Sequence, residues 1–80
     1  MRHPDLDYQL VESSLLLCEP RNAVEAFAQL NHSTEALAAA CRLSYCRDQE
    51  KCDYARQSVS TLRRRIRYLR GLHARFQVAA

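Results

Sequence analysis

Four cysteines are the first residues in this chain whose type suggests chemistry: Cys18, Cys41, Cys46 and Cys52. Structural zinc sites have cysteine pairs with two residues between them, and iron–sulfur sites use similarly short runs. Cys41 and Cys46 have four residues between them and Cys46 and Cys52 have five, so no metal centre is predicted. We expect no cofactor. Cys41, Cys46 and Cys52 remain candidates for redox chemistry or a disulfide, with Cys46, in a polar turn, expected to be the most exposed. We favour the interpretation in which they stay reduced and buried and act as small apolar residues, because cytosolic thiols are kept reduced.

A run of arginines near the carboxyl end is the second candidate. Guanidinium groups bind phosphates and carboxylates in a forked geometry, which suggests an anionic partner. The run alternates with apolar residues, as on the solvated face of a packed helix, and no compact glycine turn precedes it, as a helix-turn-helix would require. We therefore favour an acidic protein surface and keep nucleic acid as the alternative. The arginines that would bind nucleic acid are Arg63, Arg64, Arg67 and Arg70.

The histidines give no sign of an active site. His3, His32 and His73 are far apart in the sequence, and no serine, cysteine or carboxylate stands at a spacing that places it beside one of them on a helix face. A nucleophile, a base and an orienting group cannot be assembled from this pattern. The sequence predicts no catalytic residue and no enzyme.

The elements that must position these residues are predicted to be helices. One glycine and two prolines in 80 residues, with abundant alanine, leucine and arginine, are typical of an all-α domain spanning residues 1–80. A short first helix is predicted over about 5–18. Asp5 can cap its start, and its end is set by Pro20, because the residue before a proline disfavours helix. A second helix is predicted over about 20–45. We favour continuity through the weak stretch 31–34, and the alternative is a break there, with Ser33 capping a new start.

The third predicted helix, over about 48–77 and capped by Asp48, has the clearest pattern. Apolar residues alternate by three and four along it from Cys52 to Phe76. A matching seam is expected on the second helix through Phe27, Leu30, Thr34, Leu37 and Cys41. A short connection makes the two helices antiparallel neighbours in a long hairpin. Cys41 then faces Cys52 and Phe27 faces Ile66, and the first helix is expected to cover the open end near Leu69, Leu72 and Phe76.

Charge is divided unevenly along the chain. Residues 1–41 contain six Asp and Glu against two Arg, whereas residues 42–80 contain ten Lys and Arg against three Asp and Glu. The hairpin would lay the acidic half along the basic third helix, so folding explains part of this asymmetry. Exposed ion pairs contribute only about 0 to 1 kcal/mol each, and they select the orientation more than they stabilise it.

The remaining apolar residues indicate a protein partner. Several lie off the seams and are expected to be partly exposed, and clustered exposed apolar and aromatic side chains are a sign of an interface. These off-seam residues are Tyr8, Leu43, Tyr45, Tyr54, Tyr68 and Leu72. The residues predicted to bind the partner are Tyr54, Arg63, Arg64, Arg67, Tyr68, Arg70 and Leu72.

The function that follows is a non-catalytic adaptor or regulator, completed as a homodimeric bundle or bound to another protein. In size and hairpin plan alone it is similar to small bacterial secretion co-chaperones and to antiactivators. No signal peptide is recognised and no stretch approaches the roughly 20 apolar residues that span a bilayer, so we expect a cytoplasmic protein without a membrane contact.

Overall fold

The computed structural model describes residues 3–79, which contain three α-helices and no strand. Helix α1 spans Pro4–Leu15, α2 spans Ala23–Leu43 and α3 spans Gln49–Ala79. The predicted all-α fold is confirmed. The 31 residues of α3, at a rise of about 1.5 Å each, account for the longest dimension of the molecule, which is 47 Å.

Polar side chains begin α2 and α3 where the sequence offers caps. Asn22 Oδ1 accepts a hydrogen bond from the Glu25 amide at 2.9 Å and begins α2. Asp48 Oδ1 accepts from the amides of Glu50 at 3.1 Å and Lys51 at 3.3 Å. Each cap satisfies amides that have no partner inside the helix. The prediction that Asp48 caps the third helix is confirmed.

The first helix begins differently from the prediction. His3 Nδ1, and not Asp5, accepts the capping hydrogen bond, which the Asp5 amide donates at 3.1 Å. Pro4 occupies the first helical position, where its missing N–H would have had no helical partner.

Two predicted helix ranges are too long, because residues 16–22 form a linker. The range 5–18 shortens to Pro4–Leu15, and 20–45 shortens to Ala23–Leu43. The carbonyls of Leu17 and Cys18 accept hydrogen bonds from Arg65 of α3, and Pro20 is buried within the linker and does not begin α2. Helix α2 is continuous through residues 31–34, as predicted.

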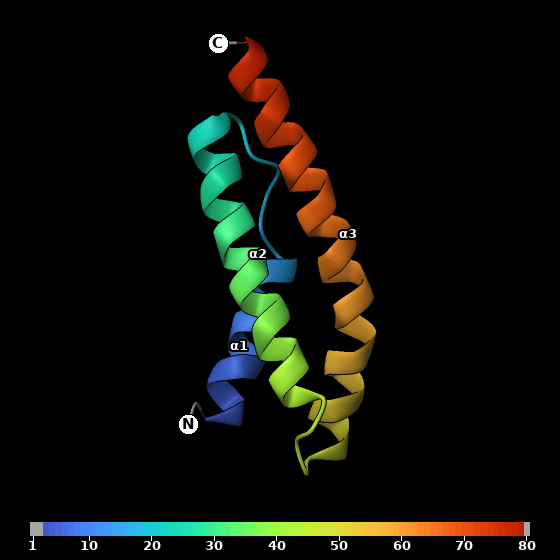
Figure 1. Ribbon diagram of the computed structural model, residues 1–80. Helices are drawn as coiled ribbons and strands as arrows, with labels where there is room; N and C mark the ends of the chain where they lie inside the picture. The colour runs from blue at the N-terminus through green and yellow to red at the C-terminus, as the bar shows by residue number, and fades with distance from the viewer. Residues whose placement is uncertain (1–2, 80) are drawn as a thin grey trace.

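Helices α2 and α3 lie side by side and run in opposite directions, joined by a bend over residues 44–48 (Figure 1). This packing is consistent with the predicted hairpin. The carboxyl-terminal turns of α3 extend beyond the start of α2 (Figure 1). The linker rises along the pair from the end of α1 to the start of α2.

The predicted position of the first helix is wrong. Helix α1 lies beside the half of the α2–α3 pair nearest the bend, not at its open end (Figure 1). Asp7, which is only 3% exposed, receives hydrogen bonds from Arg42 Nη2 at 2.9 Å and Nε at 3.1 Å. Lys51 Nζ lies 3.3 Å from Asp5 Oδ1. The physical reason is that the extended linker carries the end of α1 far from the start of α2, where its acidic first turn meets basic residues beside the bend.

The core is built from α3's predicted seam, from an unpredicted face of α2 and from Val11 of α1. On α3, Cys52, Ala55, Leu62, Ile66 and Leu69 are buried, as their spacing predicts. On α2 the buried side chains are mostly small. They are Ala26, Ser33, Ala36, Ala39, Ala40 and Leu43.

The predicted seam of α2 is therefore wrong in part. Phe27, Thr34 and Cys41 are exposed, and the centre of the Phe27 ring lies 5.6 Å from that of the His73 ring, about two turns beyond Ile66. Helix α2 packs against both α1 and α3, and this turns its small residues inward, because a position between two neighbours leaves little room for large side chains. Leu43, expected to be partly exposed, is buried in the core cluster with Val11 of α1 and Ala55 of α3.

Candidate functional site

A hollow of about 310 Å³ lies between α2 and α3. Its lining residues, which we call the arginine groove, are Thr34, Leu37, Arg63, Ile66, Arg67 and Arg70. None of them is among the residues that bond α1 or the linker to the rest of the fold. Helix α1 reaches α2 at Ser33 and Arg42, and the linker reaches α3 at Arg65 and Tyr68. The groove is thus the side of the α2–α3 pair that the rest of the described chain leaves uncovered.

The three arginines of the groove have no acidic partner within residues 3–79. Positions 63, 67 and 70 are separated by four and three residues, which places them on one side of α3. All three side chains are exposed, and no carboxylate of the described chain lies within ion-pair distance of them. The described ion pairs all lie elsewhere, so folding does not neutralise these arginines as the hairpin reasoning expected.

Apolar atoms form the floor of the groove and one flank. Ile66 is buried, Leu37 is half-buried, and the hydroxyl of Thr34 donates to the Leu30 carbonyl at 2.8 Å, which leaves its methyl group for contact. Phe27 lies seven residues before Thr34 on the same side of α2 and is 52% exposed. The groove therefore combines an apolar floor with a cationic rim.

The other predicted partner-binding residues lie elsewhere. Tyr54 faces α1, and its ring centre lies 4.9 Å from that of Tyr8. Tyr68 donates a hydrogen bond to Glu19 of the linker, which raises the pKa of Tyr68. Leu72 is half-buried, and its spacing places it on the Tyr68 side of α3. Arg64 is exposed but does not line the groove.

Arg65 is the structural residue that the sequence reasoning did not single out. One of its terminal nitrogens donates to the Gln29 side chain at 3.0 Å and to the carbonyls of Leu17 and Cys18 at 3.5 and 3.4 Å. Its Nε is buried without a hydrogen-bond partner among the described residues. Its position three residues before Tyr68, on the side away from Arg63, is the only signal in the sequence that separates it from the other arginines.

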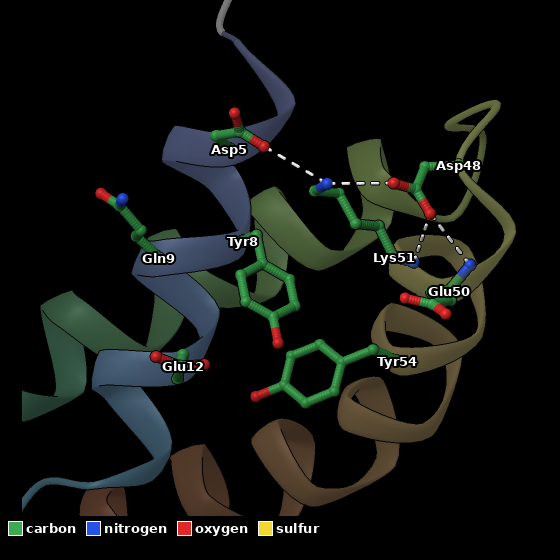
Figure 2. A pocket seen from close by; sticks show the side chains of 8 residues that line it. All are labelled: Asp5, Tyr8, Gln9, Glu12, Asp48, Glu50, Lys51 and Tyr54. Atoms are coloured by element: carbon green, nitrogen blue, oxygen red, sulfur yellow. Dashed lines mark hydrogen bonds and ion pairs between the residues drawn. The ribbon is translucent and has the colours of Figure 1, made fainter.

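A second hollow, of about 690 Å³, lies where α1 meets the start of α3. Figure 2 shows Lys51 reaching between Asp5 and Asp48, with the rings of Tyr8 and Tyr54 side by side below. Lys51 Nζ lies 3.0 Å from Asp48 and 3.3 Å from Asp5. The hydrogen bond from Lys51 lowers the pKa of Asp48, and the Asp48 and Asp5 carboxylates raise the pKa of Lys51. The chain's own ammonium group thus fills the acidic part of this hollow and joins α1 to α3.

A third hollow, of about 600 Å³, lies at the bend. Leu43 and Cys46 contribute apolar surface beside the Asp7–Arg42 pair, and Tyr45 at its edge is 89% exposed. It presents an apolar surface, and two of its charged side chains, Asp7 and Arg42, are already paired with each other.

The cysteines differ from their predicted roles. Cys18 and Cys41 are exposed, Cys46 is half-buried against the core, and Cys52 is buried with its thiol 3.1 Å from the Ser44 carbonyl. The expectation that Cys46 is the most exposed thiol is therefore wrong, because Cys46 packs against the core after the last turn of α2. All four are unbonded, and an exposed Cys41 does not share a buried seam with Cys52.

One serine–histidine contact joins α1 to α2, which single-helix spacing did not indicate. Ser13 Oγ lies 3.2 Å from His32 Nε2, and the same oxygen donates to the Leu10 carbonyl at 3.1 Å. Because the hydroxyl donates its one proton to the Leu10 carbonyl, it can only accept at His32 Nε2, which is the reverse of base activation. Within residues 3–79, no three side chains of the metal-binding types gather into a site.

None of the three helices, over the described residues, is both long and apolar enough to cross a bilayer. Comparisons of the chain with models of protein families, with curated proteins and with solved structures found no match.

Proposed function

We propose that this chain is a small non-catalytic interaction module, an adaptor or regulator, that binds another protein through the arginine groove. One observation carries the proposal: Arg63, Arg67 and Arg70 surround an apolar floor and have no carboxylate partner within residues 3–79. A helix face with apolar residues at its centre and charges at its edge is typical of helix-in-groove recognition.

Covering the arginine groove and the neighbouring Phe27 with a partner would lower the free energy by burying apolar surface. Full burial of a phenylalanine side chain is worth about 1.5 to 3 kcal/mol, so covering the exposed half of Phe27 would contribute about 1 kcal/mol. Arginine is enriched at binding hot spots because its long side chain adds apolar contact to charge. The proposal includes the expected cytoplasmic location, where the four thiols remain reduced.

Photo-crosslinking in the native cell tests the proposal. A benzoylphenylalanine placed at Thr34, inside the groove, should give a defined adduct with another protein, identified by mass spectrometry. The same group at Glu35, exposed on the neighbouring side of α2, is the matched control. Loss of the Thr34 adduct in a Leu37→Glu background would support the proposal, provided that circular dichroism shows an unchanged helix content. Equal adducts from Thr34 and Glu35 would contradict it.

Nucleic-acid binding is the second candidate, and one observation favours it. Arg56, Arg64 and Arg75 are also exposed and also have no carboxylate partner in the described chain, so basic charge extends beyond the groove. A phosphate backbone would be bound through many such contacts, and affinity would fall steeply with salt. Fluorescence anisotropy with labelled duplex DNA and RNA, at about 50 and about 200 mM salt, distinguishes this function. Weak binding at both concentrations would exclude it.

A further inference from the structure

We propose, on the basis of the proposed function, that the occupant of the arginine groove is an acidic amphipathic α-helix of another protein. Its carboxylates would pair with Arg63, Arg67 and Arg70, and one large apolar side chain would enter the hollow over Leu37 and Ile66.

The shape of the groove fits a helix. It runs between two antiparallel helices, and all six of its lining residues come from those helices. Two packed helices leave a furrow on each side of their contact, and a third helix fills such a furrow at the usual spacing of about 8 to 10 Å. Helix α1 and the linker lie along the α2–α3 pair (Figure 1), and the residues through which they bond to it do not line the groove.

The chemistry of α3 differs between its two sides. Arg65 and Tyr68, on the covered side, hydrogen-bond to the linker and to α2. Arg63, Arg67 and Arg70, on the uncovered side, pair with no carboxylate within residues 3–79. The uncovered side therefore lacks anionic partners, and in a protein partner the anionic groups that fit guanidinium groups are carboxylates.

The chain contains an example of the proposed binding mode. Helix α1 is itself acidic and amphipathic: Asp7 pairs with Arg42, Asp5 pairs with Lys51, and Val11 is fully buried between them and the end of the helix. The arginine groove offers a similar arrangement, with charged side chains along an apolar centre. Seven residues of α3 span about 10.5 Å, so matching carboxylates would be spaced by three and four residues on the partner helix.

A second copy of the chain is a poor occupant. A twofold dimer through this side would bring one arginine rim against the other, and none of the six lining residues is a carboxylate that could pair with it. Like charges in an interface oppose association. The groove thus favours a different protein over the homodimer expected from the sequence.

The test uses the full chain and labelled helical peptides in fluorescence anisotropy. The first peptide carries three glutamates spaced by four and three residues beside a leucine stripe; the second replaces the glutamates with glutamine; the third replaces the leucines with serine. We expect the first to bind at least about tenfold more tightly than either of the others. Equal affinity of the glutamate and glutamine peptides would overturn the inference.

Paired variants of α3 assign the binding to the groove. Arg63→Glu/Arg70→Glu should weaken binding of the glutamate peptide by at least about tenfold, because two ion pairs of up to about fivefold each are lost and each introduced glutamate also repels the peptide. Arg64→Glu/Arg75→Glu makes the same change in net charge away from the groove and should weaken it by less than about threefold, through long-range charge alone. Equal losses in the two variants would overturn the inference, and circular dichroism of both confirms that they fold.

Two further outcomes would also overturn it. One is a dimer in light scattering that Leu37→Glu dissociates, since the groove would then bind a second copy. The other is competition between duplex DNA and the peptide, together with DNA affinity that falls more in Arg63→Glu/Arg70→Glu than in the control Arg64→Glu/Arg75→Glu. Position-specific crosslinks from Thr34, with no preference for the acidic peptide, would leave the interaction function intact and remove only the acidic helix.

Discussion

Replacing Arg42 with methionine tests why α1 lies beside the bend. Arg42 donates two hydrogen bonds to Asp7, whose side chain is 4% exposed, and the interaction raises the pKa of Arg42. Removing one partner of a buried pair costs about 3 to 5 kcal/mol, because the other charge stays buried without compensation. The Arg42 side chain is 46% exposed, so solvent screens part of the interaction, and we expect a cost of about 2 to 3 kcal/mol.

That loss is large for a chain of this size. A total stability of about 4 to 12 kcal/mol is usual for 80 residues, and a urea slope near 1 kcal/mol per M converts the loss to a midpoint about 2 to 3 M lower. Urea titration followed by circular dichroism measures it. Arg47→Met, at an exposed arginine of the bend with no ion pair within the described residues, is the control and should change stability by no more than about 0.5 kcal/mol.

A double-mutant cycle decides whether the cost belongs to the ion pair. In an Asp7→Asn background the buried charge is absent, so Arg42→Met should cost at least about 1 kcal/mol less than in the native chain. If Arg42→Met costs the same in both backgrounds, or no more than Arg47→Met, the pair does not hold α1 in place. Amide exchange adds a local readout, because α1 should lose protection before the middle of α3 does.

Three other predictions concern the rest of the fold. Gly71→Ala should raise stability by about 0.5 to 1 kcal/mol, since Gly71 lies inside α3 and an added Cβ meets no atom within 4 Å; a thermal melt measures it. Ala36→Leu should lower stability by about 1 to 3 kcal/mol through overpacking of a fully buried site, whereas Ala38→Leu, at an exposed position of the same helix, should have little effect in urea titration. Burial, and then the neighbouring Tyr8, raises the pKa of Tyr54 above its ordinary value of 10.0. The stabilisation that depends on the neutral phenol is therefore complete below pH 10.0 and is lost as the pH rises through the raised pKa. At alkaline pH the melting temperature should fall less steeply with rising pH for Tyr54→Phe than for the native chain. Parallel curves of melting temperature against pH would contradict the assignment.

The third helix was predictable because large aliphatic residues mark its buried side. Leu62, Ile66 and Leu69 repeat at intervals of four and three, and one dominant neighbour, α2, covers them. A hydrophobic pattern identifies a face when the buried residues are also the most apolar ones. The three arginines of the groove were found for a related reason, since their spacing places them beside that face.

The inner side of α2 could not be read in the same way. Apart from Leu43 near its end, its buried residues are alanines and Ser33, while the larger Phe27 lies exposed at the edge. Close contact with two helices selects small side chains, and hydrophobicity alone does not distinguish this from a solvated alanine-rich surface. One signal was present but went unused: Asp7, Val11 and Ser14 recur at intervals of four and three on α1, which indicates a helix side with a buried carboxylate in need of a cation.

The linker between α1 and α2 has a consequence for affinity. A tether of seven residues keeps α1 at an effective concentration on the order of millimolar beside its binding surface, so contacts too weak to retain a separate peptide are sufficient to keep it docked. An untethered helix on the opposite side has no such advantage. The free energy that keeps it bound must come from its own side chains, whereas α1 is also held by its covalent connection. The lifetime of the complex at the arginine groove therefore depends on every carboxylate of the incoming helix.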